Sequence, residues 1–195
     1  MRPPAPALLP IFRSRLTGDL LALLLASPER SWTLHELADR TKVPYQTVTS
    51  EVRRLEQAGL VATTSVGRSK LVTVDAASPY LGPLTELVLM AFGPPLVVAE
   101  EFAGVEGIER LFLYGSWAAR NAGQPGRAPG DVDVLVLGHV DRDDIYEAAQ
   151  RAQHRLGREV NTTIRSSSAW DRADDAFAAT VKSSPMWALP GPWAS

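Results

Sequence analysis

Residues 33–61, TLHELADRTKVPYQTVTSEVRRLEQAGLV, contain the clearest structural signals in the first third of the chain. Thr33 and Glu36 have the spacing of a capping box, in which the Thr hydroxyl accepts a hydrogen bond from the Glu amide and the Glu carboxylate accepts one from the Thr amide. This pattern predicts a helix over residues 34–41. Pro44 and Gly59 are typical of the start and the end of a helix, so a second helix is expected over residues 45–58.

The second predicted helix has one apolar side and one polar side. Val48, Val52 and Leu55 recur at helical spacing and form the buried side. Upstream, apolar periodicity predicts a helix over residues 16–26, and downstream two alternating strands, 60–65 and 70–74, flank a turn with a basic tip. Helix, short strand, helix, turn, helix and two-stranded hairpin is the element order of a winged helix.

Residues 14–75 resemble the winged helix-turn-helix regulators of the ArsR and MarR type, on the motifs LHELA (34–38), VPYQTV (43–48) and LEQAGLV (55–61). The resemblance implies binding of double-stranded DNA as a dimer. Small polar side chains at the start of the recognition helix suit base edges, and basic side chains suit phosphates or a minor groove. The DNA-binding residues that we predict are Tyr45, Gln46, Thr47, Ser50, Arg53, Arg54, Arg68 and Lys70.

Composition and charge agree with a nucleic-acid partner for the first part of the chain only. The net charge of −2 divides into +3 for residues 1–75, with ten basic and seven acidic residues, and −5 for the rest. The absence of Cys excludes disulfides, thiol catalysis and the thiolate metal sensing of some ArsR regulators. The longest uncharged apolar run, 20–26, is short against the ~20 residues that span a bilayer. No membrane span and no secretory signal are expected, so the predicted compartment is the cytoplasm.

Two helices are predicted between the winged helix and the C-terminal part, as a helical bridge over residues 76–107. Ser78 as the N-cap and Pro79 as the first residue predict the start of one helix, which continues to Phe92. The sequence Gly-Pro-Pro at 93–95 ends it, and a second helix is expected over 96–103. The residues expected to pack against a second subunit are Leu84, Leu87, Val88 and Ala91.

Two segments of the C-terminal part carry the residues with chemical potential. LFLYGS, residues 111–116, is a buried strand that leads into a Gly-Ser turn, and DVDVLVL, residues 131–137, is a second strand. The period of two places Asp131 and Asp133 on one face of that strand. Adjacent carboxylates favour a bound cation and are ligands suited to Mg²⁺ that holds nucleotide phosphates. Gly115 and Ser116 offer backbone N–H groups and a hydroxyl to a phosphate.

Residues 108–190 resemble the DNA polymerase β-type nucleotidyltransferases, especially the minimal nucleotidyltransferases, on the Gly-Ser and Asp-x-Asp motifs. The resemblance implies that Gly115 and Ser116 bind the nucleotide, that Asp131 and Asp133 bind Mg²⁺, and that a third carboxylate lies on a later strand. That position holds Asn161, which cannot act as a general base. Glu159, two residues earlier on the same strand face, is the substitute that we predict as catalytic together with Asp131 and Asp133.

The expected fold class is α+β: a winged helix domain (1–75), the helical bridge (76–107) and a small nucleotidyltransferase-like α/β domain with a mixed sheet (108–195). The predicted function is a DNA-binding transcriptional regulator whose second domain binds a nucleoside triphosphate or a partner. The alternative is a Mg²⁺-dependent nucleotidyltransferase that modifies a protein or RNA, for example an antitoxin with a HEPN-type toxin partner. A third hypothesis has both domains as docking modules. The remaining expected elements are a helix over 143–156, a strand over 157–164, a helix over 168–182 and a short strand over 185–189.

Overall fold

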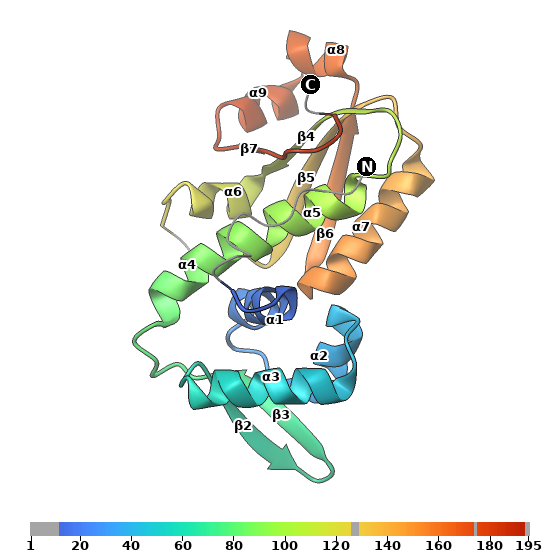
Figure 1. Ribbon diagram of the computed structural model, residues 1–195. Coiled ribbons are helices and arrows are strands. Elements are labelled where there is room, and N and C mark those ends of the chain that lie inside the picture. The colour runs from blue at the N-terminus through green and yellow to red at the C-terminus, as the bar shows by residue number, and fades with distance from the viewer. Residues whose placement is uncertain (1–11, 126–128, 174, 194–195) are drawn as a thin grey trace. The chain divides into compact units, whose positions relative to one another are not determined.

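The computed structural model describes residues 12–125, 129–173 and 175–193. These residues form two compact units, one that ends at Gly93 and one that begins at Pro94 (Figure 1). Each unit has a sheet of its own, with the strand order β1-β3-β2 in the first and β6-β5-β4-β7 in the second. The α+β class predicted from the sequence is therefore confirmed.

The N-terminal unit has the element order of a winged helix, followed by one more helix. The helices and strands bury a shared apolar core that includes Leu20, Leu37, Val48 and Val72. Its elements are α1 (Arg15–Ala26), β1 (Trp32–Thr33), α2 (Leu34–Thr41), α3 (Tyr45–Gln57), β2 (Val61–Val66), β3 (Ser69–Val74) and α4 (Leu81–Phe92).

The ends of α2 and α3 follow the signals in the sequence. The Glu36 amide donates to Thr33 Oγ1 (3.1 Å), and the Thr33 amide donates to Glu36 Oε2 (2.8 Å), so the capping box is present. Gly59 follows α3 with a φ of +68°, the left-handed conformation expected of it. Pro44 is the N-cap of α3 instead of its first helical residue.

The helix α4 begins two residues later than predicted. The amides of Ala77 and Ser78 both bond to Asp75, at its carboxylate and its carbonyl oxygen, so residues 75–80 form turns and Tyr80 becomes the N-cap. The helix packs on α1, where the ring of Phe92 lies against Gly18.

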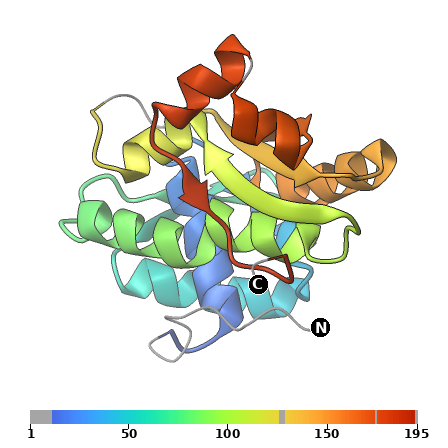
Figure 2. The same cartoon turned by 90° about the horizontal axis from the view of Figure 1, so that it is seen from above.

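The C-terminal unit is built around a mixed sheet, as predicted. The strand β4 pairs antiparallel with β5 and with β7, whereas β5 and β6 are parallel. Figure 2 shows the short strand β7 beside β4. The elements are α5 (Pro94–Phe102), β4 (Ile108–Tyr114), α6 (Gly115–Asn121), β5 (Asp131–Gly138), α7 (Arg142–Leu156), β6 (Glu159–Arg165), α8 (Ser167–Arg172), α9 (Ala176–Lys182) and β7 (Trp187–Ala188).

The single helix expected over residues 168–182 is two helices, α8 and α9. Ala173 adopts a left-handed conformation with a φ of 55° and ends α8, and Asp175 then caps α9 by accepting from the Ala178 amide. Neither proline nor glycine marks this break, which explains why apolar periodicity alone missed it.

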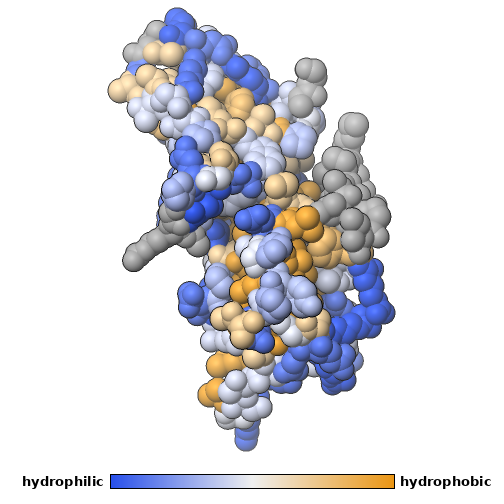
Figure 3. All heavy atoms as spheres, turned by 90° about the vertical axis from the view of Figure 1, so that its left-hand side faces the viewer, coloured by the Kyte–Doolittle hydropathy of each residue, from blue (hydrophilic) through white to orange (hydrophobic). Residues whose placement is uncertain are grey.

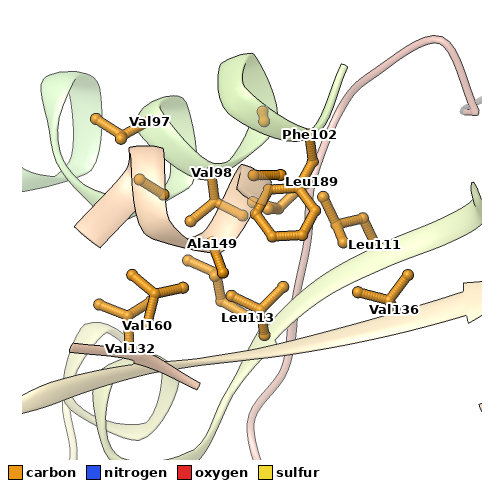
Figure 4. Close-up of a cluster of buried hydrophobic side chains, with 14 of the residues drawn as sticks. Val97, Val98, Phe102, Leu111, Leu113, Val132, Val136, Ala149, Val160 and Leu189 are labelled. Atoms are coloured by element: carbon orange, nitrogen blue, oxygen red, sulfur yellow. The ribbon is translucent and has the colours of Figure 1, made fainter. Parts of the chain in front are cut away.

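The two faces of the C-terminal sheet have different covers. On one face Val132 and Val136 pack with residues of α5 and α7 such as Phe102 and Ala149 (Figure 4). On the other face Leu135 and Leu137 pack with α8 and α9. Side chains alternate along β5, so Asp131 and Asp133 lie on the face that α8 and α9 partly cover. Trp170 belongs to the core of that face, and Trp187 and Trp193 pack against the core of the first.

Among the described residues, Leu81–Phe102 is the one stretch that is long and apolar enough to cross a membrane, by length and composition only. The structure divides it at Gly93 into α4, which contacts α1, and α5, which contacts α7. Core helices of soluble proteins pass the same test, so this stretch is weak evidence for a membrane span.

Candidate nucleic-acid interface and carboxylate site

A stripe of polar and basic side chains follows the outer side of α3. Gln46, Ser50, Arg53 and Gln57 stand at positions i, i+4, i+7 and i+11, and all four are exposed. The buried side of the same helix carries the apolar residues predicted for it. Three residues of this stripe, which we name the α3 stripe, were predicted to bind DNA. Gln57 was not among the predicted residues, although its spacing of four from Arg53 places it on the same side of the helix.

The other predicted residues of α3 lie beside the stripe. Arg54 is exposed, and its Nη1 donates to Oε2 of Glu51 at 3.1 Å. Thr47 is exposed as well. The ring of Tyr45 lies against the ring of His35 on α2, with 4.5 Å between their centroids, so the first turn of α3 is held to α2.

The wing is the hairpin of β2 and β3, which Figure 1 shows extending beyond α3. Gly67 and Arg68 form its two-residue turn, with a positive φ of 58° at Gly67, as a type II′ turn requires. Arg68 in this turn and Lys70, two residues later on β3, are exposed. The Thr63 hydroxyl donates to the Glu56 carboxylate, which joins the wing to α3.

A pair of arginines that was not predicted as functional lies against Trp32. The guanidinium carbons of Arg30 and Arg40 are 3.7 Å and 5.2 Å from the ring centroid. Burial lowers the pKa of Arg40, and the neighbouring charge of Arg30 lowers it further. Arg30 is close to Trp32 in the sequence, so the sequence contains a signal for the contact between these two residues. The contact of Arg40 with Trp32 depends on the tertiary structure.

In the C-terminal unit the predicted site residues converge at one end of the sheet. Pairing places Asp133 between Tyr114 and Asn161, and Asp131 beside Glu159. Nδ2 of Asn161 donates to Oδ2 of Asp131 at 3.1 Å.

The Gly-Ser turn approaches the carboxylates closely. Gly115 has a φ of +70°, and a Cβ added to it would lie 2.2 Å from Oδ2 of Asp133. Ser116 is exposed in the first turn of α6. We name Gly115, Asp131, Asp133 and Asn161 together the carboxylate site.

The environment of the carboxylate site opposes a second negative charge. Burial raises the pKa of Asp133, and the charge of Asp131 raises it further, whereas a hydrogen bond from Asn161 lowers it. Arg158 lies near Asp131: burial lowers the pKa of Arg158, and the Asp131 charge opposes that effect. Nη1 of Arg158 donates to the carbonyl oxygen of Pro129, which anchors the start of β5.

The donor set of the carboxylate site fits a hard divalent cation. Mg²⁺ is usually held by one or two carboxylates together with phosphate oxygens, and Asp131, Asp133 and the amide oxygen of Asn161 are donors of that class. In the described part of the chain no three His, Cys, Asp or Glu side chains are grouped as metal ligands. Glu159 is exposed and shares the strand face of Asp131 through their pairing. The site thus offers a carboxylate pair with an amide in the third position.

The comparisons with known proteins concern the winged helix. Residues 14–70 match the sequence profile of the MarR family. Among solved structures, reduced HlyU from Vibrio cholerae N16961 is similar at 20% identity and a TM-score of 0.34, over 42% of this chain and 80% of that chain. AF1382 from Archaeoglobus fulgidus is similar at 16% identity and a TM-score of 0.34, over 43% of this chain and 89% of that chain.

The transcriptional regulator BldR from Sulfolobus solfataricus is similar at 24% identity and a TM-score of 0.35, over 48% of this chain and 63% of that chain. No curated protein matches the chain. The N-terminal part of the chain is therefore a MarR-family winged helix-turn-helix domain. The profile match ends at residue 70, so the likeness of the C-terminal unit to nucleotidyltransferases is not supported by it and stays a prediction.

Proposed function

We propose that this chain, with its MarR-family winged helix over residues 14–70, is a cytoplasmic transcriptional regulator that binds double-stranded DNA as a homodimer. The observation that carries the proposal is the α3 stripe. Its polar and basic side chains are exposed along one side of the helix that follows the turn of the helix-turn-helix, and that helix is the one that enters the major groove in this class of domain.

Base contacts and phosphate contacts are assigned to different residues. Gln46 and Ser50 are near the start of α3, where side chains reach base edges, and Gln suits the edge of adenine. Arg53, farther along the stripe, is assigned to a phosphate. Arg68 at the tip of the wing and Lys70 on β3 are assigned to the DNA backbone or the minor groove.

The proposal can be tested with a short DNA duplex of random sequence, so the operator need not be known. Fluorescence anisotropy measures the binding affinity at several salt concentrations. Each phosphate contact contributes about 0.9 to the slope of log K against log salt concentration. We expect Arg53→Ala to lower the affinity for the duplex and to reduce the slope by about 0.9, the contribution of one phosphate contact. Arg142→Ala, which removes an exposed arginine from α7, is the matched control and leaves both unchanged. Equal effects of the two variants would reject the assignment of the stripe.

We propose a second function for the carboxylate site, the binding of a nucleoside triphosphate with Mg²⁺. The specific observation is that Gly115 lies beside Asp133 at one end of the sheet, where β5 also carries Asp131, although the glycine is distant from both aspartates in the sequence. Asp131 and Asp133 would hold the cation, which supplies charge neutralisation to the phosphates when bound. Ser116 would donate its hydroxyl to a phosphate.

Isothermal titration with ATP, CTP, GTP and UTP, each with and without Mg²⁺, tests this second function. Binding that requires both Mg²⁺ and the two aspartates is the expected result, and Asp131→Asn with Asp133→Asn is the variant that abolishes it. Glu147→Gln, which removes an exposed carboxylate from α7, is the control. Absence of nucleotide binding by the wild type would reject the second function and leave the first untouched.

The enzymatic alternative requires a base at the same site. Glu159 is the carboxylate that would accept the proton of an acceptor hydroxyl on a protein, such as a HEPN-type toxin, or on an RNA. Labelled nucleotide that is transferred by the wild type and not by Glu159→Gln would favour this alternative over a sensor domain.

A further inference from the structure

We infer that Glu51 is a positioning residue of the DNA-binding surface, which holds Arg54 in place for a phosphate; the inference rests on the proposed DNA binding. Glu51 lies on α3 among the apolar residues of its buried side, and it is the one charged residue in the described part of the chain that is buried. Its exposed fraction is 8%. A carboxylate in such a place is costly unless its oxygens accept hydrogen bonds.

Both oxygens of the carboxylate are occupied, and each by a different element. Oε1 accepts from Oγ1 of Thr17 on α1 at 2.8 Å, and Oε2 accepts from Nη1 of Arg54 at 3.1 Å. One carboxylate therefore connects the first helix of the domain to an arginine next to the α3 stripe.

The connection continues to the start of α1. The single proton of the Thr17 hydroxyl goes to Glu51, so the Ser14 hydroxyl, 3.0 Å away, is the donor in its bond with Thr17. Ser14 is the N-cap of α1 and also accepts from the Thr17 amide at 3.3 Å. The chain of bonds from Ser14 through Thr17 to Glu51 thus joins α3 to the N-terminal cap of α1 within the domain.

Arg54 keeps most of its hydrogen-bonding capacity while it is held. Its side chain is 44% exposed, and the bond to Glu51 occupies one of the five N–H groups of the guanidinium. A long side chain that is already ordered loses less conformational entropy when it meets a phosphate. Glu51 thereby supplies geometry, although its negative charge opposes the phosphate.

In the variant Glu51→Gln, the loss of positioning should weaken DNA binding, whereas the loss of the negative charge should strengthen it. The inference is therefore testable. The glutamine keeps the size and an oxygen for Thr17, but it loses the charge that holds Arg54. Positioning predicts weaker binding to the random duplex, by up to about tenfold, the loss expected for one charge-assisted contact. It also predicts a salt slope lower by up to about 0.9. The matched control, Glu29→Gln, removes an exposed acidic charge of the same unit and leaves the slope unchanged.

Two further variants separate positioning from a purely structural role. In the background Arg54→Ala, the added change Glu51→Gln should weaken binding no further, because there is no arginine left to position. Thr17→Val, which releases Oε1 without a change of charge, should weaken binding in the wild-type background and not in Arg54→Ala. Circular dichroism confirms that each variant is folded before binding is measured.

The results distinguish the two proposals. A wild type that does not bind the duplex overturns both. A wild type that binds, with Glu51→Gln binding equally well or more tightly, overturns the positioning role alone. Additive losses from Glu51→Gln and Arg54→Ala, or a Thr17→Val protein that is less stable but binds normally, would likewise show that Glu51 only stabilises the fold.

Discussion

Gly115 illustrates how a single residue ties the backbone of the C-terminal sheet to its candidate site. It follows β4 as the first residue of α6, in a left-handed conformation, and the space where a side chain would begin is filled by the Asp133 carboxylate. Glycine adopts such a φ without steric cost, and its lack of a Cβ allows the close approach. Glycine is therefore favoured at this position for two reasons, the backbone conformation and the space that Asp133 occupies.

Gly115→Ala should destabilise the C-terminal unit more than Gly123→Ala does. Both glycines have a positive φ, +70° and +83°, but nothing lies within 4 Å of a Cβ at Gly123. Each substitution has a conformational cost of about 1 kcal/mol or more. The difference in stability between the two variants therefore measures the clash with Asp133. Urea unfolding followed by circular dichroism measures the difference. Equal losses of stability in the two variants would show that the Asp133 side chain moves aside without cost.

At the scale of elements, the packing of α4 on α1 reverses a rule of helix propensity. Gly18 is in the interior of α1, where alanine is ordinarily better by about 1 kcal/mol. A Cβ at Gly18, however, would lie 2.3 Å from the ring of Phe92 on α4. The absence of a side chain on α1 is what lets this ring approach.

Gly18→Ala should lower the free energy of unfolding by about 1–3 kcal/mol, the cost of overpacking a core. Gly82→Ala is the control in α4, because it is helical and has nothing within 4 Å of its Cβ. That variant should raise the free energy of unfolding by up to about 1 kcal/mol. The prediction fails if both variants are stabilised in thermal unfolding.

The capping box makes the stability of α2 depend on pH. The hydrogen bond from the Thr33 amide lowers the pKa of Glu36 below its ordinary value of 4.5. A lowered pKa in the folded state means that the stabilisation is present above pH 4.5 and is lost as the pH falls through the folded value.

Glu36→Gln should therefore be less stable than the wild type near pH 7, by less than about 1 kcal/mol, and the two should converge in acid. Thr33→Ala, which removes the hydroxyl that caps the Glu36 amide, should lose about 1 kcal/mol. Unfolding curves at a series of pH values check both. A difference between wild type and Glu36→Gln that is constant with pH would contradict the role of the charge.

At the scale of the whole molecule, the proposed homodimer requires an apolar surface that the described chain leaves uncovered. Leu87 and Met90 on α4 are 47% and 52% exposed, and Tyr80 before it is 65% exposed. Figure 3 shows that apolar residues are also exposed on the face of the molecule that is turned to the viewer. Of the residues expected to face a second subunit, Leu87 is exposed, whereas Val88 is buried.

Leu87→Glu together with Met90→Glu should convert a dimer into a monomer in sedimentation experiments. A monomer contacts one half-site in place of two, so the salt slope of DNA binding should fall to about half. Tyr146→Glu on α7, which changes a large exposed side chain of the other unit, is the control and should remain dimeric. A double variant that stays dimeric would place the interface elsewhere.

Local sequence patterns were enough to predict the elements of the winged helix, the mixed α+β class and the strand face that carries Asp131 and Asp133. Caps, turns and periodicity act over a few residues, so they are legible in one short stretch. Three other features became visible in the folded molecule alone: Glu51 joins Thr17 to Arg54, Asn161 donates to Asp131, and α8 and α9 separate at Ala173. These features depend on side chains that meet from distant segments, or on a left-handed residue without a glycine, and no local pattern encodes either.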